Sequence, residues 1–198
     1  MAKGDALYLE AIERFNLLYE RAQAEPTRDP TAVTLATADA NGQPSVRTVL
    51  LKGVDARGFV FYTNSNSRKG RDLSVNARAA MLFFWHQMFE QVHVEGAVEL
   101  VAEAESDAYW ATRSRESQIG AWASAQSAVL SSRGALEARV KEYEGRFADD
   151  AIPRPPHWYG YRIRPERIEF WQSGAHRLHD RQSYEGGPRG WKVRHLSP

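Results

Sequence analysis

A strand-like segment with a cation at each end is the first part of the sequence that could bind anions. The segment RTVLLK covers residues 47–52. Side chains alternate between the two faces of a strand, so Arg47 and Lys52 point in opposite directions and could serve two different anionic groups. The alternative is a pair of solvated surface cations. The two faces are Arg47, Val49 and Leu51, and Thr48, Leu50 and Lys52.

The basic pair Arg68-Lys69 follows Ser67 at a predicted helix start. Free backbone N–H groups and the helix dipole make such a position a binding place for anions, and two adjacent cations suit a phosphate. An exposed basic turn is the competing interpretation.

A phenol, a guanidinium and a hydroxyl follow one another closely in residues 109–122. If residues 105–113 are helical, Tyr109 and Arg113 lie on one face, because residues four apart are neighbours on a helix. With Ser117 they could form a phosphate clamp. Alternatively, Tyr109 belongs to the core and Arg113 pairs with Glu105.

The segment EFWQSGAHRLHDR, residues 169–181, is the densest run of polar and aromatic side chains. Trp171 offers a flat face, and the pattern predicts an extended segment along which cationic and imidazole groups alternate. His176, His179 and Asp180 match no standard metal-ligand spacing, and nearby arginines would repel a cation, so we expect no metal. A planar anionic ligand fits better. The alternating residues are Arg177, His179 and Arg181.

The elements that must position these residues are mostly short strands. A helix is predicted over 5–24, capped by Asp5 and ended by Pro26 and Pro30. Alternation and turn residues then predict an antiparallel meander, a short helix that ends near Asn76, and two further strands. The predicted strands are 31–38, 45–52, 58–63, 78–85 and 91–101.

Residues 103–147 are predicted to be mainly helical, with breaks near Ser114 and at Ser131-Ser132. Three prolines at 153, 155 and 156 mark an irregular connection, and three strands follow at 158–165, 167–172 and 191–196. No linker divides the chain, so residues 1–198 are interpreted as one domain. The expected fold is mainly β with helices (α+β): a closed or nearly closed antiparallel barrel with helical decoration.

Composition excludes several classes of protein. The 198 residues carry a net charge of +1 and no cysteine, which argues against general nucleic-acid or membrane-surface binding and excludes disulfides. The apolar run 79–85 is far shorter than the roughly 20 residues that cross a bilayer. The N-terminus does not resemble a signal peptide, and the expected location is cytoplasmic.

Five motifs together resemble one family. RTVLLKG, FYTNSNSRKGRDL, EQVHVEG, SRESQIGAW-x3-QS and IEFWQSGAHRLHDR occur in this order, between about Pro30 and Pro198. They are similar to the motif series of the pyridoxamine 5′-phosphate oxidases, which are homodimeric FMN-binding split-barrel enzymes. The resemblance implies an antiparallel split β-barrel with FMN at the interface between two subunits.

The resemblance also implies which residues hold FMN. Arg68 and Lys69 would bind the phosphate, and Gln91 would face the flavin ring. The lining strand would be Arg47, Thr48, Val49, Leu50, Leu51 and Lys52, together with Tyr62 and Thr63. Gln126, Ser127, Trp171 and Arg181 would reach the cofactor from the partner subunit.

For the substrate, the resemblance implies a phosphate clamp of Lys52, Tyr109, Arg113 and Ser117. The trio Arg177, Leu178 and His179 would lie at the pyridine ring, where Arg177 steadies negative charge and His179 positions or assists a proton. Hydride would pass from pyridoxamine or pyridoxine 5′-phosphate to FMN, giving pyridoxal 5′-phosphate. Dioxygen would reoxidise the flavin and yield hydrogen peroxide.

Three departures from the family pattern bear on substrate binding. A basic N-terminal segment that covers the substrate in many relatives is expected to be missing, Glu90 stands where relatives often have arginine, and Ser114 replaces a proline.

The alternatives are a sister oxidase of the phenazine-biosynthesis type, a non-catalytic protein that binds FMN or pyridoxal phosphate, and a small-barrel RNA binder. The intact clamp and Arg177-Leu178-His179 trio favour the oxidase of vitamin precursors.

Overall fold

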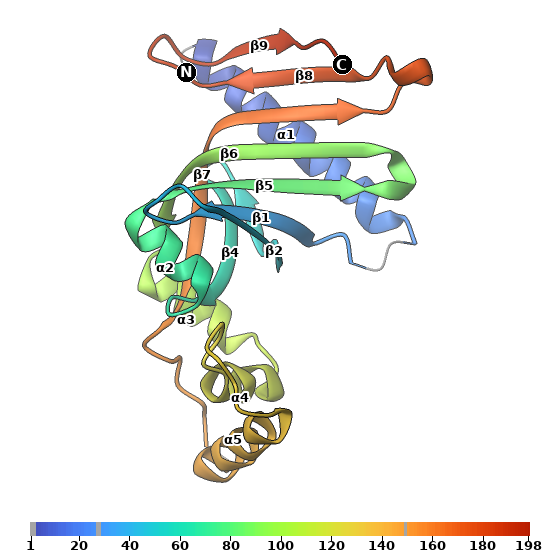
Figure 1. The fold of residues 1–198 in the computed structure, drawn as a ribbon. Coiled ribbons are helices and arrows are strands. Elements are labelled where there is room, and N and C mark those ends of the chain that lie inside the picture. Colours follow the sequence, from blue (N-terminus) through green and yellow to red (C-terminus); the bar gives the residue numbers. More distant parts are fainter. Residues whose placement is uncertain (1–2, 27–28, 149) are drawn as a thin grey trace.

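The computed structural model describes residues 3–26, 29–148 and 150–198, which form one large sheet with helices at its faces and end (Figure 1). The strands are β1 (Ala32–Ala38), β2 (Pro44–Leu50), β3 (Gly53–Asp55), β4 (Gly58–Asn64), β5 (Arg78–Trp85), β6 (Glu90–Leu100), β7 (Trp158–Gln172), β8 (Asp180–Glu185) and β9 (Lys192–His195). The helices are α1 (Lys3–Ala24), α2 (Arg68–Val75), α3 (Glu103–Ala111), α4 (Arg115–Ala123) and α5 (Arg133–Phe147), with short 3-10 turns η1 (His86–Met88) and η2 (Ala175–Arg177).

The sheet is antiparallel and divides at its longest strand. Its order is β2-β1-β5-β6-β7-β4-β3, and β8 and β9 continue from β7. The first part of β7 pairs with β4 and its last part pairs with β8, while β6 follows both parts. A hydrogen bond from Lys52 N to Val60 O, 2.8 Å long, ties the end of β2 to β4. The sheet therefore curls back on itself, and the expected nearly closed antiparallel barrel is confirmed.

The core lies between α1 and the concave side of the curled sheet. Phe15 of α1 is fully buried, with its ring centroid 4.8 Å from that of Phe59 and 5.0 Å from that of Phe83. A second cluster, which includes Trp110, Phe147 and Trp158, joins α3, α4 and α5 to the start of β7. Aromatic packing of this kind fixes the helical part beside the barrel.

Most of the predicted elements are confirmed, and the differences have local causes. The strand expected over 45–52 ends at Leu50, where the chain turns into β3. Helix α1 already includes Lys3, so Asp5 is not its N-cap. The expected strands 158–165 and 167–172 are one strand, because Pro165 stands opposite Gly96, where the register shifts between Glu95 and Gly96. A bulge of this kind accommodates a proline, which cannot donate to the ladder.

The segment that follows β7 also differs from expectation. An extended run was expected through Arg177 and His179, but residues 175–177 form η2, in which His176 and Arg177 have φ of 55° and 65°. Residues 180–185 then form β8, which was not predicted as a strand. Within the described ranges, no helix combines the length and apolar character needed to cross a bilayer.

Gly96 provides a test of the close approach between the backbones of β6 and β7. A Cβ at this position would lie 1.9 Å from the carbonyl oxygen of Arg164, whereas a Cβ at Gly120 in α4 would meet nothing within 4 Å. Gly96→Ala should lower the free energy of unfolding by about 1–3 kcal/mol, because the two backbones must separate. Gly120→Ala should raise it by about 0.5–1 kcal/mol through helix propensity. Urea denaturation of both variants measures their free energies of unfolding, and equal values would contradict the close approach of the two strands.

Candidate functional site

A cavity of about 440 Å³ opens between β2, β4, α2, α3 and α4. It collects side chains that lie far apart in the sequence and that the family resemblance implies for FMN or substrate binding. All of its lining residues except Ser114 are predicted site residues. They are Thr48, Val49, Leu50, Lys52, Tyr62, Thr63, Lys69, Tyr109, Arg113, Ser114, Ser117 and Gln126.

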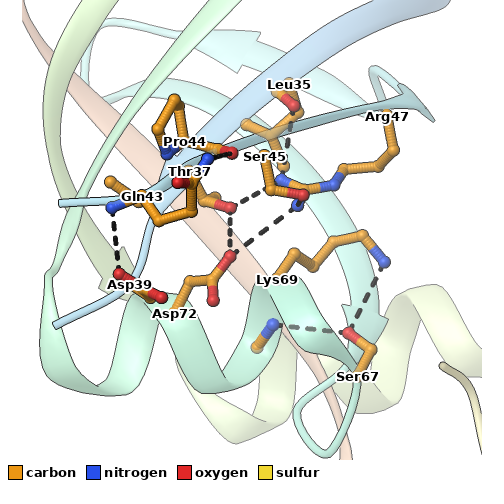
Figure 2. Close-up of polar contacts among 12 residues, drawn as sticks. Leu35, Thr37, Asp39, Gln43, Pro44, Ser45, Arg47, Ser67, Lys69 and Asp72 are labelled. Carbon is orange, nitrogen blue, oxygen red and sulfur yellow. Dashed lines mark hydrogen bonds and ion pairs between the residues drawn. The ribbon is translucent and has the colours of Figure 1, made fainter. Parts of the chain in front are cut away.

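The start of α2 places Lys69 at one side of this cavity. Ser67 caps the helix, and its Oγ accepts a hydrogen bond from the Gly70 amide (Figure 2). Lys69 is only 8% exposed, and its Nζ donates to Gln126 Oε1 at 3.0 Å and to Thr63 Oγ1 at 3.2 Å. In the described part of the chain no carboxylate pairs with it. Burial, and secondarily the charge of Arg47, lowers the pKa of Lys69 from 10.5 to about 8.

Arg47 reaches α2 from the inner face of β2. Its guanidinium donates to Thr37 Oγ1 at 2.7 Å and to Ser45 Oγ at 2.8 Å, and it lies 3.7 Å from Asp72 Oδ2 (Figure 2). Burial lowers the pKa of Arg47, an effect that Asp72 opposes and that Arg68 reinforces. Arg47 is therefore held in place by hydrogen bonds and is not a free surface cation.

Lys52 lies on the other face, as the alternation predicted. Burial alternates along β2, Leu51 is 3% exposed and belongs to the core, and Lys52 is exposed at the cavity. The opposite orientation of Arg47 and Lys52 is confirmed, and their service to two different anionic groups stays a prediction.

Aromatic stacking positions the third group of residues. The Tyr109 ring stacks on Tyr62 at 4.1 Å, and the Arg113 guanidinium lies 4.8 Å from the Trp158 ring centroid. Burial lowers the pKa of Arg113, and its Nη2 donates to Ser117 O at 3.0 Å. The alternative that Arg113 pairs with Glu105 is wrong. Glu105 pairs with Arg57 and Arg162 instead.

A second cavity, of about 490 Å³, lies on β5, β6, β7 and β8. Gln91 and Trp171 line it, and so does Arg181, whose Nη2 lies 2.7 Å from Glu169 Oε1. Glu169 is 6% exposed and also pairs with Arg167. A buried carboxylate thus fixes the orientation of the arginine at the wall of this cavity.

The trio Arg177, Leu178 and His179 lies in the connection between β7 and β8. The His179 ring is 4.7 Å from the Trp171 ring, and its Nδ1 accepts a hydrogen bond from Gly174 N at 3.2 Å. An accepting Nδ1 leaves the proton of the neutral imidazole on Nε2, which can then act as a donor. Arg177 is exposed and Leu178 is 72% exposed.

The predicted site residues therefore fall into two groups within one chain. Figure 1 shows the β7–β8 connection at the opposite end of the molecule from α4. The resemblance implied that Gln126 reaches across from a partner subunit, yet it contacts Lys69 and Thr63 of its own chain. Ser127 is exposed with φ of 69°. The predicted site residues that line neither of these two cavities are Arg47, Leu51, Arg68, Ser127, Arg177, Leu178 and His179.

Sequence reasoning missed three residues that hold the functional side chains in place. Asp72 stands three positions after Lys69, a spacing that puts both on one helix face and could have identified it. Glu169 and Trp158 gave no comparable local signal. Their partners Arg181 and Arg113 are 12 and 45 residues away in the sequence, and only the folded sheet brings them together.

Comparison with known families gives a match over most of the chain. Residues 19–147 match the family described as pyridoxamine 5′-phosphate oxidase, and residues 158–198 match the pyridoxine 5′-phosphate oxidase C-terminal dimerisation region. Among curated relatives, the pyridoxine/pyridoxamine 5′-phosphate oxidase of Alkalilimnicola ehrlichii is 58% identical over 96% of this chain and 97% of the relative. That of Anaeromyxobacter dehalogenans is 56% identical over 96% of each.

Solved structures agree on the architecture. PhzG from Burkholderia lata, in complex with tetrahydrophenazine-1-carboxylic acid, superimposes with a TM-score of 0.90 and 36% identity over 94% of this chain and 92% of that one. A pyridoxamine 5′-phosphate oxidase-related, FMN-binding protein from Nostoc punctiforme has a TM-score of 0.74 at 16% identity, over 94% and 96%, and supports the fold alone. With two family models that together cover most of the sequence, the chain belongs to the pyridoxamine 5′-phosphate oxidase family.

Proposed function

We propose that this protein oxidises pyridoxamine 5′-phosphate or pyridoxine 5′-phosphate to pyridoxal 5′-phosphate, with FMN as its redox cofactor. The observation that carries the proposal is a single cavity lined by three cations from separate parts of the chain, Lys69 of α2, Lys52 after β2 and Arg113 between α3 and α4. Three cations suit two phosphates, one on the cofactor and one on the substrate. Relatives named for this reaction are 58% and 56% identical to the chain.

The residues at the start of α2 fit the FMN phosphate. Lys69 is a buried cation for which the described residues supply no carboxylate, and its Nζ lies 3.5 Å from Oγ of Ser67, the N-cap of α2. An anion there would pair with the amine and would remove much of the cost of burying the charge. When bound, FMN supplies the hydride acceptor and passes the electrons to dioxygen, which leaves as hydrogen peroxide.

The residues around Arg113 fit the substrate phosphate. Arg113 and Lys52 supply positive charge, and the hydroxyls of Tyr109 and Ser117 line the same cavity. Because this clamp grips the substrate far from the reacting carbon, its binding energy orients the pyridine ring without taking part in the bond changes. Stacking on Tyr62 and Trp158 keeps the clamp rigid.

A second copy of the chain would complete the site. The cross-strand row Thr48, Thr34, Leu82, His93 and Glu169 connects the two cavities along one face of the sheet. That face exposes large apolar side chains, 67% of Val46 and 52% of Phe84 among them. Two copies joined by this face in a homodimer would bring Trp171 and Arg181 of one to the Lys69 cavity of the other, so FMN would lie at the interface.

Within this assembly Arg177 and His179 act at the pyridine ring. The Nε2–H of His179 donates a hydrogen bond to the substrate, since its Nδ1 is already occupied by Gly174 N. Arg177 stabilises negative charge that the substrate carries on its oxygen atoms, since the departure of hydride leaves the reacting carbon electron-poor. The left-handed backbone at Arg177, with φ of 65°, is a costly conformation of the kind found at functional sites.

One observation favours a second candidate. The TM-score of 0.90 with PhzG makes a phenazine-type flavin oxidase compatible with the same fold. The clamp argues against it, because two cations and two hydroxyls exceed what one carboxylate of a tricyclic ligand requires.

The direct test is anaerobic reduction of the purified protein loaded with FMN. Adding pyridoxine 5′-phosphate or pyridoxamine 5′-phosphate should bleach the flavin absorbance, and admitting air should restore it, with pyridoxal 5′-phosphate recovered. Bleaching by a reduced phenazine carboxylate but by neither vitamin precursor would favour the PhzG-like candidate. Stable FMN binding without bleaching by any of them would identify a non-catalytic flavoprotein.

The composite site can be tested by mixing defective subunits. Arg113→Met and Arg177→Met should each abolish most of the activity as homodimers. Unfolded together and refolded, they should regain about a quarter of wild-type activity, because half of the dimers are mixed and each mixed dimer has one intact site. The control is Arg113→Met with Lys52→Met, which damages the same half of the site and should restore nothing. Equal recovery in both mixtures would contradict the arrangement.

The lowered pKa of Lys69 predicts pH-dependent cofactor binding. The free protein releases this proton as the pH rises through about 8, whereas the unfolded chain keeps it to about 10.5. The stability of the free protein should therefore rise between these values, while FMN affinity falls because the phosphate needs the charged amine. Flavin fluorescence titrations from pH 7 to 9.5 should show this loss, and Lys69→Arg should remove it. The same pH profile in both proteins would exclude Lys69 as the phosphate ligand.

A further inference from the structure

We propose that Asp72, on α2, is a positioning residue that holds Arg47 in the cofactor's phosphate cradle. The cradle consists of Arg47, Lys69 and the N-terminus of α2. This inference rests on the proposed function, since it assumes that the cradle takes a phosphate, and it assigns the cradle a component that does not itself touch the ligand.

Asp72 is joined to Arg47 by a short relay. Its carboxylate is 5% exposed, and Oδ2 accepts a hydrogen bond from Thr37 Oγ1 at 2.6 Å. The same hydroxyl accepts a hydrogen bond from Arg47 Nη1 at 2.7 Å, and Arg47 Nη2 lies 3.7 Å from Asp72 Oδ2 (Figure 2). Thr37 has one proton to donate, so its donation to Asp72 leaves a lone pair for the arginine. The three groups from β1, β2 and α2 therefore have one consistent arrangement.

This relay opposes a repulsion within the cradle. Arg47 and Lys69 come from different elements and carry the same charge, and Arg47 contributes to the lowered pKa of Lys69. Neutral acceptors hold Arg47 as well, Leu35 O and Ser45 Oγ among them, but Asp72 supplies the countercharge that offsets this repulsion. Asp72 lies on the buried face of α2 together with Lys69, three residues later. One short helix thus carries both a phosphate ligand and the group that draws the second cation towards it.

The position of Asp72 places it behind Arg47. Neither residue lines the cavity in which Lys69 lies, but the Asp72 side chain is the more buried of the two, 6% exposed against 19% for Arg47. A carboxylate facing a phosphate would repel it, whereas one behind the arginine orients the guanidinium. We therefore expect the effect of Asp72 on an anion to pass through Arg47.

A double-mutant cycle tests this dependence. Apoprotein variants are titrated with FMN and with riboflavin, which lacks the phosphate, and binding is followed by flavin fluorescence. Asp72→Asn should weaken FMN binding about tenfold, the loss expected for one charge-assisted hydrogen-bond network, and should leave riboflavin binding unchanged. In an Arg47→Met background, Asp72→Asn should leave FMN binding unchanged or strengthen it, because only the repulsion between carboxylate and phosphate then remains.

The outcomes separate positioning from stability. Equal weakening by Asp72→Asn in both backgrounds, or equal weakening of FMN and riboflavin, would overturn the proposal. If Asp72→Asn does not fold, Thr37→Val breaks the same relay and enters the same cycle. Asp55→Asn is the matched control, since it removes an Asp–Arg ion pair with Arg57 outside the cavity. Equal affinity of the wild-type protein for FMN and riboflavin would instead contradict the proposed function, because no phosphate site would exist.

Discussion

The burial of positive charge beside α2 is the constraint around which the site is organised. Lys69 is almost fully buried with only Gln126, Thr63 and Ser67 oxygens as partners among the described residues, and Arg47 lies close enough to depress its pKa. Desolvated cations are costly, so this burial lowers the stability of the free protein, and the proposed phosphate would offset part of that cost. The same cost explains why the Lys69 amine donates hydrogen bonds to all three of these neighbouring oxygens. A preorganised cationic cradle needs little rearrangement when a phosphate arrives.

Strand β7 accounts for the division of the site into two halves. Trp158 at its start supports Arg113, whereas Trp171 near its end stacks against His179. Across the sheet, four strand spacings separate Thr48 from Glu169, which is about 19 Å along the surface. No side chain spans that distance, so one chain cannot bring Arg181 or His179 to its own Lys69 cavity. A shared exposed face and a C-terminal dimerisation region both point to a second copy as the solution.

Local patterns predicted the elements better than they predicted the contacts between them. Alternation identified β1 and β2 because each has one buried face, and Ser67 identified the start of α2 because a cap is a local feature. Tyr109 and Arg113 line the same cavity, but not through the predicted helical spacing, because α3 ends at Ala111 and Arg113 follows its C-cap. Pro165 and the turn at His176 misled the prediction, since a bulge in a neighbouring strand and two left-handed residues leave no periodic signal. The partners of Arg47 and Arg181 could be identified only once the register of the sheet was known.

The structure also explains two departures from the family pattern. Glu90 was expected to make its surroundings less favourable to an anion, but it is 6% exposed and lies 3.3 Å from Arg21 of α1. Its charge is therefore largely balanced by the helix, and the potential near Gln91 is less negative than the sequence alone indicates. Ser114, in place of a proline, caps α4 by accepting a hydrogen bond from Ser117 N. A proline at a helix start restricts the backbone, and a capping serine fixes the same turn through a hydrogen bond. A hydrogen bond thus fixes the start of α4, and the ion pair with Arg21 balances the charge of Glu90.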